Sequence, residues 1–161
     1  MLVEPRVLKI EMVKRADGSG LLRCTRSDGS VTWQKQSERH AAHFTYHDLT
    51  HYAVETTLGC KQGFFGLIAA GWNIEDTTGK GARGPLPEEA TEVESVVGLF
   101  DAERGSGTLW TEEEFAQFAP RAASRKLDGT AIRAVRSARA DLFRRWADMQ
   151  AGGTLKLEFV E

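Results

Sequence analysis

Long apolar runs are missing from this sequence. The longest, residues 64–72, spans nine residues, whereas a helix that crosses a membrane needs about 20. The first residues also lack the basic segment and apolar run that are typical of an export signal. We therefore expect a cytoplasmic protein that does not enter a membrane.

Cysteine is nearly absent, and so is any large excess of one charge. Cys24 and Cys60 are the only two cysteines, and no Cys-x-x-Cys pair occurs. This excludes a cysteine-rich zinc ribbon and a disulfide framework, so we expect two free thiols. The 21 basic and 23 acidic residues leave a net charge of -2. A chain so close to neutral has no general attraction to nucleic acid, which we do not expect as a partner.

Alternation of apolar and polar residues marks both ends of the chain. Three strands are expected in the N-terminal part, near residues 6–14, 20–26 and 31–36. Asp17-Gly18 and Asp28-Gly29 separate them, and Asp-Gly tolerates the positive φ angles of tight hairpin turns. Residues 1–36 are therefore predicted to form a β meander.

A fourth strand is predicted at the C-terminus. Leu155, Leu157 and Phe159 alternate with polar residues over residues 154–160, after a Gly-Gly pair that ends a helix. Residues 45–150 carry helical signals instead. We predict one α+β domain over residues 1–161, with an antiparallel sheet of about four strands and about five helices inserted between the third and fourth.

The first of these helices is expected over residues 46–58. Thr45 and Asp48 have the spacing of a capping box, in which two side chains bind the free N–H groups at a helix start. Gly59 suits its C-terminal end. Asp128 is the predicted N-cap of the long last helix, and the glycines and proline of residues 76–86 predict a loop.

All four histidines lie within twelve residues: His40, His43, His47 and His51. In a helix, His47 and His51 occupy successive turns of one face, with Glu55 one turn further on. Two neutral imidazoles at this spacing can bind one divalent ion, and a carboxylate can supply a third ligand.

The predicted cofactor is therefore a divalent metal ion, zinc first. The predicted ligands are His47, His51 and Glu55, with His43 as a possible fourth. Asp48 would orient an imidazole or accept a proton from metal-bound water, as the catalytic residue of a hydrolase acting on a small-molecule substrate. Glu75 and Asp76 are reserve ligands from a second element, and His40 is another donor before the helix.

The motif His47-Asp48-x-x-His51 resembles the His-Glu-x-x-His motif of zincin metalloproteases, with aspartate in place of the glutamate base. It is also similar to the His-Asp-x-x-His motif of a ubiquinone-biosynthesis protein family. That family has an acid twelve residues after the second histidine, where this chain has Gly63. The His47-Asp48 pair resembles HD-domain phosphohydrolases, which are all-helical. Each resemblance implies metal chemistry, and none spans enough of the chain to assign a family.

An alternative interpretation is a non-catalytic binding or assembly module in which the histidines are structural. Charge is segregated along the chain: residues 75–114 hold eleven acids and three cations, and residues 121–148 hold eight cations and three acids. The dipolar surface that results would meet a partner, or its charges would pair with each other and with solvent. The sequence leaves the oligomeric state open.

Overall fold

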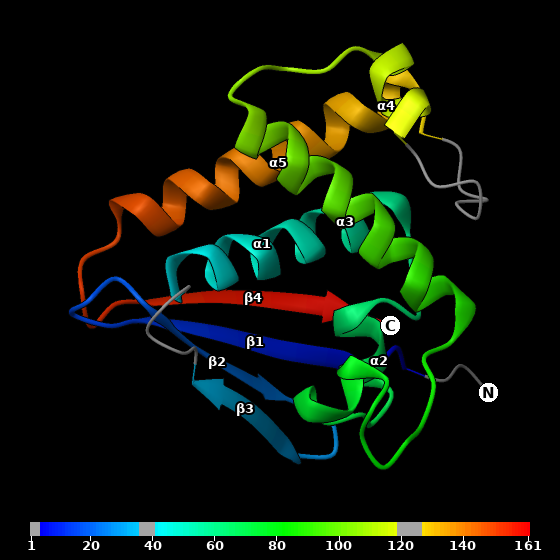
Figure 1. Cartoon of the computed structure of the whole chain (residues 1–161). Helices are drawn as coiled ribbons and strands as arrows, with labels where there is room; N and C mark the ends of the chain where they lie inside the picture. The colour runs from blue at the N-terminus through cyan, green and yellow to red at the C-terminus, as the bar shows by residue number, and fades with distance from the viewer. Residues whose placement is uncertain (1–3, 36–40, 119–126) are drawn as a thin grey trace.

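The computed structural model describes residues 4–35, 41–118 and 127–161, and its chain forms an α+β fold (Figure 1). The strands are β1 (Val7–Lys14), β2 (Gly20–Thr25), β3 (Val31–Lys35) and β4 (Thr154–Val160). The helices are α1 (Ala41–Leu58), α2 (Phe64–Ala69), α3 (Glu88–Ser106), α4 (Glu112–Phe118) and α5 (Gly129–Asp148), and η2 (Ile74–Thr78) is a short 3-10 helix. In this description, five α-helices lie between β3 and β4, as predicted.

The four strands form one antiparallel sheet in the order β3-β2-β1-β4. Gly18 and Gly29 have φ angles of 82° and 86°, so both Asp-Gly pairs make the predicted turns. The last strand pairs with the first over its whole length, with Val7 opposite Val160 and Val13 opposite Thr154. Both chain ends therefore build the sheet, which confirms the predicted architecture.

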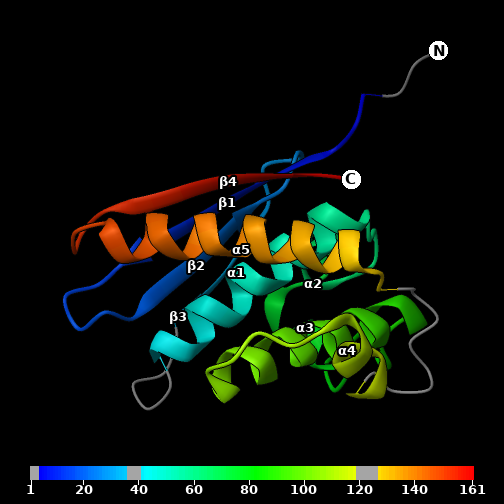
Figure 2. The same ribbon diagram turned by 90° about the horizontal axis from the view of Figure 1, so that it is seen from above.

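One face of the sheet is buried under helices. Leu8, Ile10 and Met12 of β1 are at most 2% exposed, and the β4 residues Leu155 and Phe159 face the same side. Helix α1 contacts β2, and α2 contacts β1 and β4. Helix α1 also packs against both α5 and α3, which flank it when the molecule is seen from above (Figure 2). This central position brings side chains of α1 against α3.

The start of α1 differs from the prediction. The helix includes residues from Ala41 onward, so Thr45 and Asp48 lie inside it and do not cap residue 46. Alanine is the best helix former, and no glycine or proline separates Ala41 from Thr45, so nothing interrupts the helix there. The correction places His43 in the helix, one turn before His47.

Other predicted helix ends agree with the structure. The backbone N–H of Ala131 donates to Asp128 Oδ1 at 2.8 Å, so Asp128 caps α5. Gly59 has a φ of 69° after the end of α1. The predicted loop over residues 76–86 is wrong at its start, because η2 extends to Thr78 and is held by a capping box between Asn73 and Asp76. No helix in the described ranges is long and apolar enough to cross a membrane.

Candidate metal centre

Helix α1 presents His43, His47, His51 and Glu55 at intervals of four residues, so they occupy successive turns of one face. His43 is exposed, His47 is partly buried, and His51 is 3% exposed. Burial thus increases steadily along the stripe toward the C-terminal end of α1. His40, the remaining histidine, lies outside the described residues.

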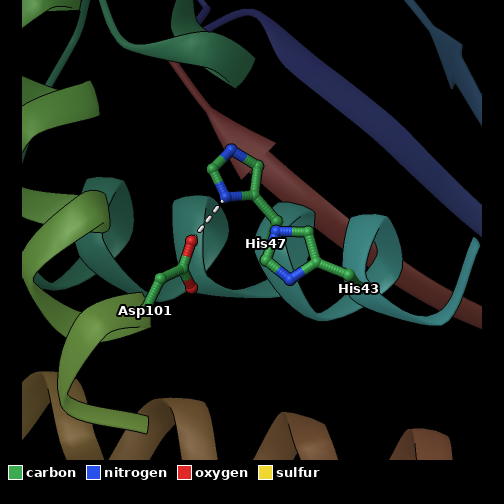
Figure 3. Close-up of side chains that lie close together, drawn as sticks. All are labelled: His43, His47 and Asp101. Atoms are coloured by element: carbon green, nitrogen blue, oxygen red, sulfur yellow. Dashed lines mark hydrogen bonds and ion pairs between the residues drawn. The ribbon is translucent and has the colours of Figure 1, made fainter. Parts of the chain in front are cut away.

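Two acids of α3 face this stripe. Asp101 Oδ2 lies 2.7 Å from Nδ1 of His47, and Glu94 Oε1 lies 3.4 Å from Nε2 of the same ring. Both imidazole nitrogens of His47 therefore meet a carboxylate from the neighbouring helix. Figure 3 shows His47 pointing from α1 toward Asp101 on α3, with the ring of His43 beside it.

His51 repeats this arrangement one turn deeper. Its Nε2 lies 2.8 Å from Glu94 Oε2, and its Nδ1 lies 3.2 Å from Glu55 Oε2. The other oxygen of Glu55 accepts hydrogen bonds from the backbone N–H groups of Phe65 and Gly66, at 3.0 and 3.2 Å. Glu55 is 1% exposed. Its carboxylate is therefore fixed between His51 and the free N–H groups at the start of α2.

Two sets of side chains in the described residues could each hold one ion. The inner group is His47, His51 and Glu94, and the outer group is His43, His47 and Asp101; in each, the ligand atoms lie within 4.8 Å of one another. The groups share His47. Glu94 bridges the Nε2 atoms of two histidines in the inner group, whereas the outer group depends on the exposed His43.

The carboxylates change the acidity of both imidazoles. Burial disfavours the charged ring of His47, but the hydrogen bonds that the charged ring donates to Asp101 and Glu94 outweigh burial and raise its pKa to about 10. Burial also disfavours the charged ring of His51, but its hydrogen bonds to Glu55 and Glu94 outweigh burial and raise its pKa to about 9. The two histidines in turn hold the pKa of Glu94 well below its usual range. Without a metal ion, the cluster is a network of imidazolium–carboxylate pairs at neutral pH.

A small cavity adjoins the inner group. It has a volume of about 30 Å³, and His51, Glu94 and Phe64 are among its lining residues. A cavity of this size holds about one water molecule. The side chain of Glu94 is 57% exposed, so the inner group is open to solvent on one side.

The other predicted site residues lie elsewhere. Asp48 is 8% exposed, belongs to neither ligand group and acts electrostatically on Cys24 of β2, where burial and then the Asp48 charge raise the thiol pKa to about 12. Asp76 accepts a hydrogen bond from the Asn73 N–H at 3.0 Å, so it caps η2. Glu75 is exposed and is in neither group.

Sequence reasoning missed Glu94 and Asp101. They are seven residues apart, so on α3 they project within about 20° of each other. Val97 lies between them on the same side of the helix and is fully buried. Acids that border a buried stripe at this spacing are a signal in the sequence, but pairing them with the histidines requires knowing that α3 packs on α1.

No family model, curated protein or solved structure matches the chain.

Proposed function

We propose that this protein binds one divalent metal ion at the inner group, through Nε2 of His47, Nε2 of His51 and a carboxylate oxygen of Glu94. The observation that carries the proposal is the shared orientation of the two rings. Both Nε2 atoms approach the carboxylate of Glu94, at 3.4 and 2.8 Å. Each Nδ1 atom contacts a carboxylate of its own, which is Asp101 for His47 and Glu55 for His51. Metal-binding histidines typically have such a carboxylate behind the ring, where it fixes the orientation and tautomer.

This arrangement changes the predicted role of Glu55. Its carboxylate lies on Nδ1 of His51, on the opposite side of the ring from Glu94. Glu55 therefore orients His51 in this proposal, as Asp101 orients His47, and Glu94 is the third ligand instead. A tetrahedral zinc site places its ligand atoms about 3.3 Å apart. In the inner group the ligand atoms lie within 4.8 Å of one another, so the side chains would adjust when zinc binds.

Zinc is the first choice among divalent ions because two imidazoles and one carboxylate are ligands it commonly takes. The exposure of Glu94 leaves a fourth position for water. Hydrolysis by such a water, with Asp48 as the base, stays a prediction: Asp48 is in neither ligand group, and the adjoining cavity of about 30 Å³ has room for water but not for an organic substrate.

A second candidate function has its own support. Every ring nitrogen of His47 and His51 already contacts a carboxylate. The cluster could therefore serve only to hold α1 against α3 in a non-catalytic binding module. The two functions differ in one measurable property, which is the affinity of the untagged protein for metal.

Isothermal titration calorimetry of untagged protein with zinc, manganese and nickel tests the proposal. We expect one ion per chain, and a large loss of affinity in Glu94→Gln, which keeps the shape of an exposed side chain. His51→Ala should remove most bound metal while helix α1 persists, because alanine favours helix. Zinc should raise the melting temperature of the wild type above its value in chelator.

His43→Ala is the matched control. It removes an exposed histidine of the same helix face that the inner group does not use, so metal affinity should stay close to that of the wild type. If His43→Ala abolishes binding and Glu94→Gln does not, the ion belongs to the outer group. If the wild type and His51→Ala bind equally little of all three metals and melt identically with and without chelator, the metal proposal is wrong and the structural function stands.

A further inference from the structure

A second feature lies on α3 and α5, apart from the histidine cluster. A cavity of about 580 Å³ opens between the C-terminal end of α3 and the middle of α5. Its volume is in the range of pockets that bind small organic molecules, roughly 300–1,000 Å³. Helix α3 is followed by its C-cap Gly107, whose φ of 73° lies in the left-handed region that ends a helix.

Three arginines line the cavity against a single acid. Arg104 comes from α3, and Arg136 and Arg139 come from α5. The acid, Glu103, is 2% exposed and pairs with both Arg136 and Arg139. After this pairing, the lining retains an excess of positive charge.

Arg104 carries one of the two net positive charges and lies outside the pairing with Glu103. Its guanidinium lies 4.5 Å from the ring centre of Tyr46 and 5.4 Å from that of Phe143. Across the residues that the structure describes, no hydrogen bond or ion pair engages it. Its position over the rings is set by cation–π contact, which leaves the N–H groups available to an anion.

The rest of the lining is largely apolar. Leu109, 76% exposed, borders the cavity opposite α5, and Phe143 and Ala140 contribute to it from α5. An exposed leucine and an aromatic ring that line the same cavity offer apolar contact surface near a cation. A simple inorganic anion would use the arginine and leave this surface in water.

We propose that this cavity binds a small amphipathic organic anion, with an acidic head group on Arg104 and an aliphatic or aromatic body against Leu109 and Phe143. Any such ligand has a carboxylate, sulfonate or phosphate group joined to an apolar group. The site is independent of metal binding at the inner group.

Fluorescence of 8-anilinonaphthalene-1-sulfonate, an aromatic sulfonate, reports occupancy on the whole protein. We expect saturable enhancement by the folded protein and displacement by octanoate. Octanol, which has the body without the charge, and acetate, which has the charge without the body, should displace it at least tenfold less well. Inorganic phosphate should behave like acetate, which separates an amphipathic ligand from a simple anion.

Two variants locate the site. Arg104→Met keeps the apolar stem over Tyr46 but removes the charge, and octanoate affinity should fall about tenfold or more because a hydrogen bond to a charged group is lost. Leu109→Ser should weaken octanoate binding without changing its dependence on charge. Arg23→Gln, on the exposed face of β2, should have no effect.

Far-UV circular dichroism and the melting temperature establish that each variant is folded, because the dye also binds partly unfolded chains. The proposal is overturned if octanol displaces the dye as well as octanoate does. It is equally overturned if phosphate alone competes fully, or if folded Arg104→Met binds octanoate like Arg23→Gln.

Discussion

Nε2 of His51 lies 2.8 Å from Oε2 of Glu94, and this contact joins the centre of the fold to its outer helix α3. His51 is almost fully buried, whereas the Glu94 side chain is 57% exposed. The pair therefore connects the protein interior to solvent through one carboxylate. With a metal ion bound, the same two atoms would be ligands of that ion; without it, they form an ion pair.

The metal-free protein should lose stability as the pH rises above neutral. The pKa values of His47 and His51 are raised from 6.5 to about 10 and about 9 in the folded chain. A raised histidine pKa contributes stability that is complete below the unfolded value of 6.5 and is lost as the pH passes through the folded value. In chelator, the melting temperature should therefore fall between pH 6.5 and pH 10.

Glu94→Gln is the test of the cause, because it removes the carboxylate that both rings share. Its melting temperature in chelator should depend less on pH over this interval. In saturating zinc, the melting temperature of the wild type should instead rise with pH near pH 6.5, since the ligands bind metal as neutral imidazoles. A melting temperature in chelator that stays constant from pH 6.5 to 10 would contradict the network.

Asp101→Asn tests the orienting role of the carboxylate behind His47. Asparagine keeps the size of the side chain but removes the charge that holds Nδ1 at 2.7 Å. Loss of such an orienting carboxylate typically lowers metal affinity about 10–100-fold. Calorimetry with zinc should show this loss with one ion still bound. Asp141→Asn, on the exposed face of α5, should retain wild-type affinity, and equal affinities in the two variants would exclude the role.

The strands could be predicted because their signals are local. Alternation at Leu155, Leu157 and Phe159 and the two Asp-Gly turns depend only on neighbours in sequence, and the structure has all four strands within a residue or two of the predicted bounds. The start of α1 was mispredicted because Thr45 and Asp48 have capping spacing yet are buried inside the helix.

The candidate site was predictable only in part, because half of it comes from another helix. The i, i+4 spacing of His47 and His51 is a property of one helix and is visible in the sequence. Glu94 reaches them only through the packing of α3 on α1, which no local pattern encodes. The position of Glu55 likewise depends on a contact with α2, and its carboxylate faces Nδ1 of His51, the ring nitrogen opposite the one that Glu94 contacts.

Removal of the last strand should cause the chain to aggregate. A chain ending at Ala151 loses β4, which pairs with β1 along its full length. The lost residues include Leu155 and Phe159, which are 5% and 2% exposed, so part of the core would be open to water. An exposed β1 edge would also offer unpaired backbone groups to other chains. The truncated chain should be insoluble, or should elute as aggregates in size-exclusion chromatography. A soluble truncated chain with a cooperative melting transition would contradict this.

Gly63 lies where any side chain would displace Glu55, and its replacement should damage the candidate site from a distance. A Cβ atom at position 63 would lie 2.4 Å from Cδ of Glu55 and 2.5 Å from its Oε1. Glu55 is fully buried, so its carboxylate has to leave Nδ1 of His51 and the N–H groups of Phe65 and Gly66 to make room. Gly63→Ala should destabilise the protein by about 1–3 kcal/mol, the cost of leaving buried polar groups unsatisfied, and should weaken zinc binding.

Gly98→Ala is the matched control, because a Cβ there contacts nothing within 4 Å and alanine stabilises an exposed helix position by about 0.5–1 kcal/mol. Urea unfolding measures the first effect and calorimetry the second. Should Gly63→Ala match Gly98→Ala in both, Glu55 does not hold His51 in place.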